Sequence, residues 1–554
     1  MKKDLGVPIK VEFIDRDPLV VNEAIDDYMN LEKRYKDLID EFVICPFGMY
    51  TLPEGFITNA KTVVLGEFFE QELSNQIMPS TVTNLQMKRS YNYQKGIPSS
   101  LIKLDLVTHL HKIPKLPPNL KSLSISYLSQ PEDKSIFPPD SLTEVTTGCL
   151  NLLVILPDTV STLDFTNELD LAYFSPVGMP NNIKSLKFIC PQPNHFQLLS
   201  RNLVDLTIMF SNDYPINLGD NNLCLPPSLT SVKLHQFYGN ICKGALPISG
   251  LKDMQLIFSG VQDSLQECFI PMSVTRLLIY FCSIKKFPKH FSLPNSITDL
   301  DINCQNKDII KKHIPMSVEK LVIGNLYSPK NKSLYFSKIP TQLSVGRDLT
   351  HLSLFFSRKT KLKSNMFPSC LTFLSLNIAT DSVDIQLEPN LLSHIGNLEV
   401  LLLGPIKVLP GSIPSCVTKL ALDLSHSWKL EANVIPKSVR NLILKSTTTN
   451  SISLDKIPNS VEALRLNAYG GYETLDHLSD SLKYIDYGPH FTCPNFDGSK
   501  FKLLTHIKNF PLIYSAPFHF PPNLISLHMT PKSYGHNFIA KSLSFPNIPY
   551  IQIK

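Results

Sequence analysis

The stretch LPPNLKSLSI, from Leu116 to Ile125, decides the fold expected for this chain, because near copies of it return far away in the sequence. LPPSLTSVKL occupies Leu225–Leu234 and FPPNLISLHM occupies Phe520–Met529. The shared pattern is an apolar residue followed by P-x-[STN]-[LVI]-x-x-L-x-[LIM]. The recurrence of one phrase at such distances indicates an internal repeat.

Copies of the phrase follow one another through most of the chain. Clear copies begin at Pro79, Pro98, Pro117, Pro157, Pro180, Pro226, Pro271, Pro294, Pro315, Pro368, Pro414, Pro436, Pro458 and Pro521. Degenerate or looser copies begin at Ile57, Pro139, Ser200, Ile248, Gly346, Ile395, Ser479, Phe501 and Phe545. Together they predict a repeat array over residues 53–554, with about 23 units of about 22 residues each.

The phrase predicts a short strand in every unit. The last two apolar positions of L-x-L are two residues apart, so they lie on one face of a strand. A unit this small cannot bury that face alone, whereas stacked units can pair their strands into a parallel sheet over a continuous core. Proline before the strand sets an extended or turn entry, and the Ser, Thr or Asn two residues later can satisfy local backbone groups. We therefore expect a repeat solenoid with a parallel β-sheet on one face, extended or short helical connections on the other, and few long helices.

The pattern L-x-x-L-x-L resembles the leucine-rich-repeat superfamily. The phrase P-x-S-[VL]-x-x-L-x-[LIF] at this period more closely resembles the FNIP-repeat proteins known from social amoebae, over roughly residues 53–554. The Phe-Asn-x-Pro/Ile element of that family is missing from nearly every copy. The resemblance implies a repeat scaffold and brings no catalytic residue with it. The LPPNLKSLSI form is also similar to the repeats of secreted bacterial ubiquitin ligases, but the repeats here continue to the last residue and leave no room for a catalytic domain.

Residues 1–52 lack the phrase. Apolar residues between Val21 and Phe42, among them Ile25 and Met29, fit an amphipathic helix with acidic residues towards its start. A helical cap that protects the first repeat is one interpretation. An adaptor segment that recruits a partner, such as a ubiquitin ligase for which the repeats would be the substrate receptor, is the other.

Composition and motifs argue against an enzyme. Charged residues make up 18% and the net charge is only +5, while the eleven cysteines form no C-x-x-C pair and are expected to be buried thiols. We find no phosphate-binding loop, zinc-protease or nucleophile-elbow motif, and no metal site is expected at His109 and His111. Asp299 and Asp301 share a strand face that we expect to be solvated. No cofactor is predicted, no apolar run is long enough to span a bilayer, and we expect a cytoplasmic location.

Any function must lie in the residues that vary between copies. Positions that flank the inward leucines point to the exposed sheet face, which is the usual binding surface of a solenoid. This column is polar and of mixed sign in the first half of the chain and turns apolar later. The predicted apolar strip consists of Phe355, Phe373, Val400, Leu402 and Ile443. A few scattered apolar residues covered by a loop is the alternative.

A second candidate is a basic region over residues 305–363. The region has twelve Lys or Arg residues and three acidic residues, a local net charge of +9. It also contains the insert 324–345, which lies within the widest gap between two copies of the phrase. Candidate contacts are Lys330, Lys332, Lys338, Arg358, Lys359, Lys361 and Lys363. We expect a protein-interaction scaffold whose partner is a protein, acidic or phosphorylated where it meets this region. An anionic lipid or nucleic-acid binder is the alternative, although the outward column mixes Asp with Lys and gives no continuous basic track. The oligomeric state does not follow from the sequence.

Overall fold

A computed structural model gives the arrangement of the chain, which divides into two compact units, Met1–Met254 and Gln255–Lys554, each considered by itself. The structure describes residues 10–13, 25–26, 28–30, 39, 41–45, 51–69, 71, 73, 77–88, 97–110, 115–128, 134–153, 155–174, 179–191, 196–211, 215–219, 223–259, 262, 264–281, 284, 291–304, 314–324, 348–356, 362–378, 385–424, 430–446, 454–468, 470–471, 475, 477–488, 491–492, 497–512, 519–531 and 550–553.

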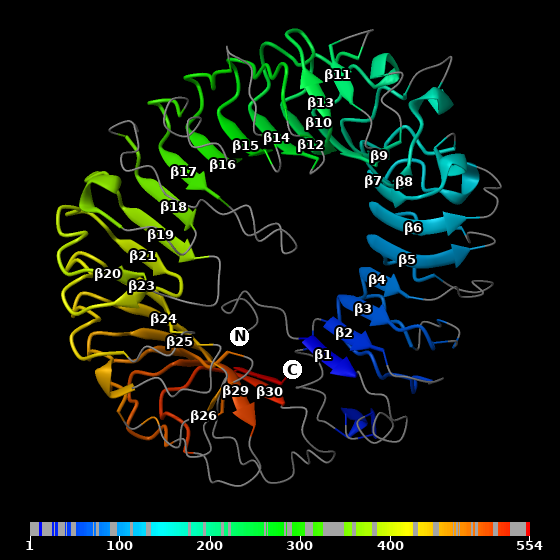
Figure 1. The fold of residues 1–554 in the computed structure, drawn as a ribbon. Helices are drawn as coiled ribbons and strands as arrows, with labels where there is room; N and C mark the ends of the chain where they lie inside the picture. The colour runs from blue at the N-terminus through cyan, green and yellow to red at the C-terminus, as the bar shows by residue number, and fades with distance from the viewer. Residues whose placement is uncertain are drawn as a thin grey trace. The chain divides into compact units, whose positions relative to one another are not determined.

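The first unit contains one parallel sheet in which every strand pairs with the strand of the next repeat (Figure 1). Its strands in order are β1 (Lys10–Phe13), β2 (Glu41–Ile44), β3 (Thr62–Leu65), β4 (Asn84–Met87), β5 (Lys103–Leu110), β6 (Ser122–Leu128), β7 (Glu144–Thr147), β8 (Thr162–Glu168), β9 (Ser185–Cys190), β10 (Asp205–Phe210) and β12 (Ser231–Phe237). β14 (Asp253–Phe258) crosses the division between the units in the sequence.

The second unit repeats the same construction. Its parallel sheet contains β15 (Arg276–Phe281), β16 (Asp299–Cys304), β17 (Lys320–Ile323), β18 (His351–Phe356), β19 (Phe373–Ile378), β21 (Val400–Leu403), β23 (Lys419–Asp423), β24 (Asn441–Ser446), β25 (Ala463–Ala468), β27 (Tyr484–Asp486), β29 (His506–Leu512), β30 (Ser526–Pro531) and β31 (Tyr550–Ile553). Each copy of the repeated phrase is thus followed by one strand, and the predicted leucine-rich-repeat-like solenoid is confirmed.

The proline of the phrase begins a tight turn. The carbonyl oxygen of Pro117 accepts a hydrogen bond from the N–H of Leu120 at 3.2 Å, and the corresponding bond recurs from Pro79 to Pro521. Where the chain then enters the strand, two consecutive N–H groups share one acceptor. Lys121 N and Ser122 N both donate to Ile102 O of the preceding repeat, at 2.8 and 3.1 Å. Proline suits the first position of this turn because its missing N–H is not needed there. The turn therefore fixes where each strand starts against its neighbour.

The polar residue two positions after the proline links one repeat to the previous one. Ser438 Oγ donates to the carbonyl oxygen of Val417, 21 residues earlier, at 2.7 Å. Equivalent bonds of 2.6–3.0 Å are made by Ser100, Ser141, Asn182, Ser228, Ser296, Ser317, Ser460 and Ser481. The sequence prediction that these side chains satisfy local groups at their own bend is therefore wrong, because their hydrogen bonds run to the preceding repeat.

The core lies behind the sheet and takes the same residues from each copy. In LPPNLKSLSI, Leu116, Leu120, Leu123 and Ile125 are at most 3% exposed. Ser122 and Ser124 on the opposite strand face are half-buried and Ser126 is exposed. This alternation confirms the predicted orientation of the strands, since neighbouring residues of a strand point to opposite faces.

The connections away from the sheet are short. Described helical turns of three or four residues are η1 (Lys134–Ile136), η2 (Leu150–Leu152), η3 (Leu171–Phe174), η4 (Phe196–Leu198), η5 (Ser364–Met366) and η6 (Leu454–Lys456). Short parallel pairs join consecutive connections: β11 (Ile216–Leu218) with β13 (Gly239–Ile241), β20 (Gln386–Leu387) with β22 (Lys407–Val408), and β26 (Gly470–Gly471) with β28 (Phe491–Thr492). In the described ranges, no helix is both long and apolar enough to cross a membrane.

The N-terminal region differs from its prediction. Ile25 and Tyr28 are helical and buried, as expected, but Phe42 belongs to β2 and not to a helix. β1 pairs with β2, and β2 pairs with β3, so the sheet extends into residues 1–52. The helix prediction fails at Phe42 because the short run EFVI can satisfy either periodicity, and pairing with the first repeat favours the strand. A role of residues 1–52 as a cap or adaptor stays a prediction.

Candidate interaction surface

The outward sheet face of the second unit is built from rows of residues in register. The middle outward row runs from Leu278 on β15 to Asp486 on β27. Its members are Leu278, Asp301, Val322, Ser353, Ser375, Leu402, Ala421, Ile443, Arg465 and Asp486. These are the positions that the repeat phase predicts from the sequence, so the register confirms the predicted column.

Five apolar side chains adjoin one another on this face, and we call them the apolar strip: Phe373, Val400, Leu402, Ala421 and Ile443. Phe373 and Val400 are register partners on β19 and β21, and Leu402, Ala421 and Ile443 are register partners across β21, β23 and β24. Adjacent parallel strands are about 4.8 Å apart, so the middle-row members span about 10 Å. His351 extends the first row by stacking on Phe373, with ring centroids 5.5 Å apart.

The strip is less exposed than the sequence suggests. Phe373, Val400, Leu402 and Ile443 are half-buried, and Ala421 is only 9% exposed. Phe355, which the sequence assigns to the same strip, is half-buried in an outer row opposite Asn377. The amide of Asn377 donates to Ser375 Oγ at 3.0 Å, so polar groups lie between Phe355 and the strip. The structure therefore brings together four of the five predicted apolar residues.

Charged pairs border the strip where the strands begin. Lys419 Nζ lies 3.3 Å from Glu399, Lys483 Nζ lies 2.7 Å from Glu462, and Arg440 lies 3.8 Å from the same Glu462. The hydrogen bond from Lys483, and then its charge, lower the pKa of the Glu462 carboxyl. Exposed pairs of this kind stabilise a protein by about 0–1 kcal/mol each. An apolar centre with a polar border is the anatomy of a protein-binding patch.

A hydrogen-bonded network adjoins the other end of the strip. Asp486 is 3% exposed and accepts bonds from Arg465 Nε at 2.9 Å, Asn509 Nδ2 at 2.7 Å and Gly488 N at 3.1 Å. Burial opposes the charge of Arg465, but Asp486 and a hydrogen bond with Tyr484 outweigh it and raise the pKa of the guanidinium. Burial, and then Asp486, raise the pKa of the Tyr484 hydroxyl. Arg465 is therefore a fixed cation beside Ile443, its register partner on β24.

Comparison with known proteins agrees with the repeat pattern. The family model described as FNIP Repeat matches residues 407–447. This segment is similar to an FNIP repeat. It includes β23 and β24, and therefore two members of the apolar strip, Ala421 and Ile443. The predicted resemblance is confirmed there, and the strand register places the chain among leucine-rich-repeat-like solenoids.

Two solved structures show some similarity to this chain. One is the crystal structure of CroV588, described as a novel circular LRR protein, with 18% identity, a TM-score of 0.49, and coverage of 99% of this chain and 93% of that one. The other is the mouse RP105/MD-1 complex, with 15% identity, a TM-score of 0.38, and coverage of 89% and 85%. A search of curated proteins gave no match.

The predicted basic region falls largely outside the residues that the structure describes. This holds for Lys330, Lys332, Lys338, Arg358, Lys359 and Lys361, and for the insert 324–345 except Gly324. Lys363 is described and exposed, directly before η5. The role of this region in binding stays a prediction.

Asp299 and Asp301 lie on β16 in the described part and have ordinary structural partners. Asp299 pairs with Lys320 at 3.0 Å, and Asp301 accepts a bond from the Tyr280 hydroxyl at 3.2 Å. Among described residues, no group of three or more His, Cys, Asp or Glu could hold a metal ion.

The same outward rows are polar in the first unit. Gln86 Nε2 donates to Asp105 at 3.1 Å, and Lys187 Nζ pairs with Asp164 at 2.7 Å. Thr207 and Lys233 continue this row on β10 and β12. The predicted contrast between a polar first half and an apolar later half of the face is confirmed at these positions.

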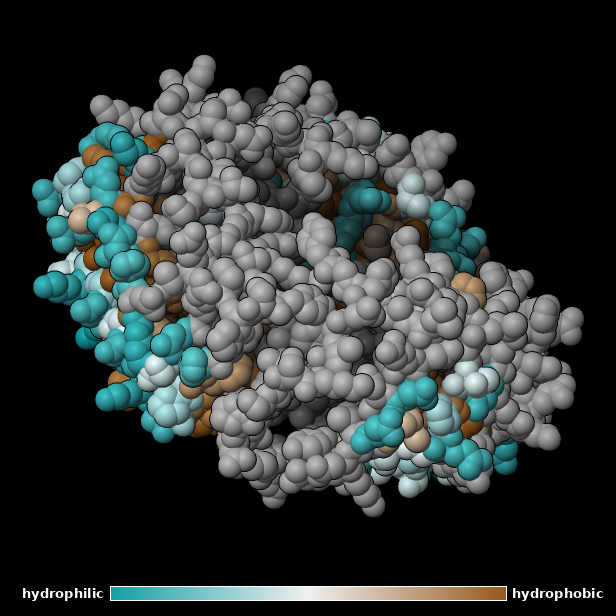
Figure 2. Space-filling model, turned by 90° about the horizontal axis from the view of Figure 1, so that it is seen from below, coloured by the Kyte–Doolittle hydropathy of each residue, from teal (hydrophilic) through white to brown (hydrophobic). Residues whose placement is uncertain are grey.

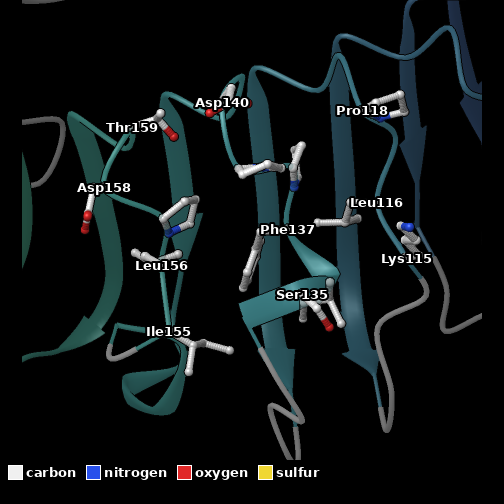
Figure 3. Close-up of a pocket in the computed structure, with 14 residues that line it drawn as sticks. Lys115, Leu116, Pro118, Ser135, Phe137, Asp140, Ile155, Leu156, Asp158 and Thr159 are labelled. Atoms are coloured by element: carbon white, nitrogen blue, oxygen red, sulfur yellow. The ribbon is translucent and has the colours of Figure 1, made fainter.

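A groove of about 1040 Å³ lies on the side of the connecting segments in the first unit. Figure 3 shows that Leu116, Phe137 and Leu156 come from three successive connections, with Pro118, Asp140 and Thr159 along the same edge. Leu116 and Leu156 occupy the same place of their repeats, as do Pro118, Asp140 and Asp158, so the groove lies between stacked repeats. Figure 2 shows mostly hydrophilic side chains on the described surface in that view, with hydrophobic ones between them. Isolated exposed apolar residues are normal on a protein surface.

Sequence reasoning missed two features of the second unit. The Arg465–Asp486 network could have been anticipated, because the two opposite charges occupy consecutive places of the outward row. Met272 and Met316, which are 65% and 60% exposed, stand directly after the anchor prolines of their repeats. That position is the least constrained of the phrase, so no signal distinguished them.

Proposed function

We propose that this chain is a non-enzymatic scaffold that binds a protein partner through the apolar strip of its second unit. The observation that carries the proposal is the register of the strip: apolar residues of four adjacent strands, β19, β21, β23 and β24, meet on the sheet face that solenoids use for binding. Nothing in the packing of the repeat requires apolar residues there, because other repeats place Ser, Thr, Asp or Lys at the same position.

The physical basis of binding would be desolvation of the strip on a rigid support. Half-buried Phe373, Leu402 and Ile443 retain apolar surface that a partner side chain can remove from water, at about 25 cal/mol per Å². Their strands are hydrogen-bonded on both sides, so little conformational entropy is lost on binding. The neutralised pairs at the border exclude water from the centre and contribute little affinity themselves.

A site-specific crosslinking experiment tests this. A photo-reactive phenylalanine analogue is placed at position 402 of the intact chain, in cells, and crosslinked proteins are identified by mass spectrometry. We expect one or a few discrete protein adducts, which disappear when Phe373→Ser and Ile443→Ser are added. The same analogue at position 316 provides the matched control, since Met316 is more exposed but lies on the turn edge and not on the sheet face.

The outcomes are distinct. Equal adducts from positions 402 and 316 would show that exposure, and not the strip, determines contact, and the proposal would fail. The absence of any adduct at 402 would overturn it as well. Circular dichroism of the Phe373→Ser/Ile443→Ser variant checks that the sheet is intact.

A further inference from the structure

The geometry points to Arg465 as an anchor for a carboxylate of the partner, so we infer that the strip recognises a protein segment in which an acidic residue accompanies apolar ones. This inference rests on the proposed function and names the chemistry of the partner. Arg465 and its partners lie outside the basic region 305–363.

Arg465 is held in place from behind. Its Nε donates to Asp486, whose carboxylate is itself fixed by Asn509 and Gly488. A guanidinium has five N–H donors, and among described residues Asp486 and Tyr484 are its hydrogen-bond partners. The Arg465 side chain is 41% exposed whereas the Asp486 side chain is only 4% exposed, so part of the fork faces outward beside the strip. A fork that is already oriented loses less entropy when it binds a carboxylate.

The surrounding charge favours an anion. On the outward face from β23 to β29, the described cations are Lys419, Lys445, Arg465 and Lys508, and the described anions are Asp423 and Asp486. Lys445 and Lys508 are exposed, whereas Asp486 is buried with its oxygens engaged. The field offered to a ligand above Arg465 is therefore positive.

The spacing defines the partner further. Arg465 and Ile443 are register partners one strand apart, and Leu402 lies two strands beyond Ile443. With about 4.8 Å between strands, the carboxylate would stand about 5 Å from one apolar contact and about 15 Å from the other. A segment lying across the strands, with apolar residues over Leu402 and Ile443 and an acidic side chain or terminal carboxylate at its end, satisfies these distances.

A protein carboxylate fits better than nucleic acid. Single-stranded nucleic acid requires a continuous cationic groove with stacking rings. Here apolar Ala421 and Ile443 precede Arg465, and the acidic Asp423 lies on the same face. Bidentate recognition by arginine suits one planar carboxylate next to an apolar contact.

The test uses the intact chain and a displayed library of random peptides of about twelve residues, a length that spans several strands. Peptides are selected on the wild-type chain after depletion on the Leu402→Ser/Ile443→Ser variant, so that only strip-dependent binders remain. We expect these peptides to combine two apolar residues with Asp, Glu or a free terminal carboxylate. Strip-dependent peptides without an acidic group would overturn the inference but leave the proposed function standing.

A double-mutant cycle then locates the carboxylate. Replacing the acidic residue of a selected synthetic peptide by its amide should weaken binding to the wild type by about tenfold or more, and to Arg465→Gln by less than about twofold. Glutamine keeps an N–H donor for Asp486, and Arg440→Gln, at the border of the strip, is the matched control that should preserve the full tenfold difference. An equal loss on Arg465→Gln and wild type refutes the role of Arg465.

Two further outcomes would refute the inference. If no strip-dependent peptide is recovered, both the inference and the proposed function fail for peptide segments. If a single-stranded oligonucleotide displaces the selected peptide and binds with steep salt dependence that Arg465→Gln removes, the ligand is a phosphate and the inference is wrong.

Discussion

Replacing Ser438 by alanine should weaken the stacking of two neighbouring repeats without touching the hydrophobic core. Ser438 Oγ donates to Val417 O at 2.7 Å, and Val417 and Val439 beside these groups are fully buried. Alanine removes the donor and leaves the part-buried carbonyl oxygen of Val417 without this partner. The change is small in volume, so the loss of one hydrogen bond dominates the effect.

We expect Ser438→Ala to lower the free energy of opening of these repeats by about 1–2 kcal/mol. A neutral hydrogen bond contributes about 1 kcal/mol net, and an acceptor left unsatisfied in a buried place raises the cost towards 2 kcal/mol. Since stability in a solenoid is a sum of repeats and nearest-neighbour interfaces, this cost falls on the repeats that contain β23 and β24. Local opening there should become about 5–30 times more frequent.

A matched control exists in the same unit. Ser273 occupies the same place in its repeat, but its buried hydroxyl has no hydrogen-bond partner in the described structure. Ser273→Ala therefore removes an unsatisfied polar group, and should leave the stability unchanged or raise it slightly.

Hydrogen exchange of the native chain, followed by mass spectrometry of peptides, separates the two variants. Peptides that cover β23 and β24 should exchange faster by the factor given above in Ser438→Ala, while peptides from β15 and β16 should keep their wild-type rates. In Ser273→Ala no peptide should exchange faster. If both substitutions accelerate exchange equally, the bond between repeats does not stabilise the stack and the reasoning is wrong.

Three other changes test the core, the titration and the backbone. Leu300→Asp puts an unpaired charge at a 0% exposed position and should cost about 3–5 kcal/mol, seen as local protease sensitivity; unchanged circular dichroism and protease resistance would contradict the inward phase. Burial, and then Glu267, raise the pKa of Cys268 to about 12. Between about pH 9 and pH 12 only the unfolded thiol ionises, so stability should fall with rising pH by about 1.4 kcal/mol per unit, a slope absent from urea unfolding of Cys268→Ala. Gly239→Ala should disrupt the β11–β13 pair, because φ is +141° and an added Cβ would clash with the carbonyl oxygen of Ile216; wild-type exchange rates there would refute this.

The repeat and its inward positions could be predicted because they recur. Leu123 and Leu300 stand at the same place of the phrase, and each is at most 1% exposed. The strand register then follows, since the same turn precedes many of the described strands between Pro79 and Pro521. One copy alone, such as SRNLVDLTI from Ser200, would have been a weak signal, but its neighbours fix its phase.

The surface could be predicted only as a column of side-chain identities. The sequence placed Leu402, Ile443 and Arg465 in one row, and the register confirms the row. The sequence provided no measure of exposure, because exposure depends on how closely neighbouring rows of side chains stand. The sequence therefore overstated how far the strip is exposed to solvent. It also could not show that Asn509, two repeats beyond Arg465, helps to orient it, because φ of Asn509 is +54° and the bulge of β29 breaks the regular phase there.

Separation of structural and variable positions explains how such a chain can acquire a binding site. The turn, the bond between repeats and the inward leucines use backbone groups and a few fixed side chains, so the outward rows are free to change without loss of the stack. Apolar residues in these outward rows have an energetic cost. The apolar surface of Phe373, Val400, Leu402 and Ile443 faces water when nothing covers it. The network at Asp486 has a further cost, since a buried carboxylate must be fully hydrogen-bonded. The repeat needs neither feature, yet they adjoin on the same face, and the proposed ligand would account for both.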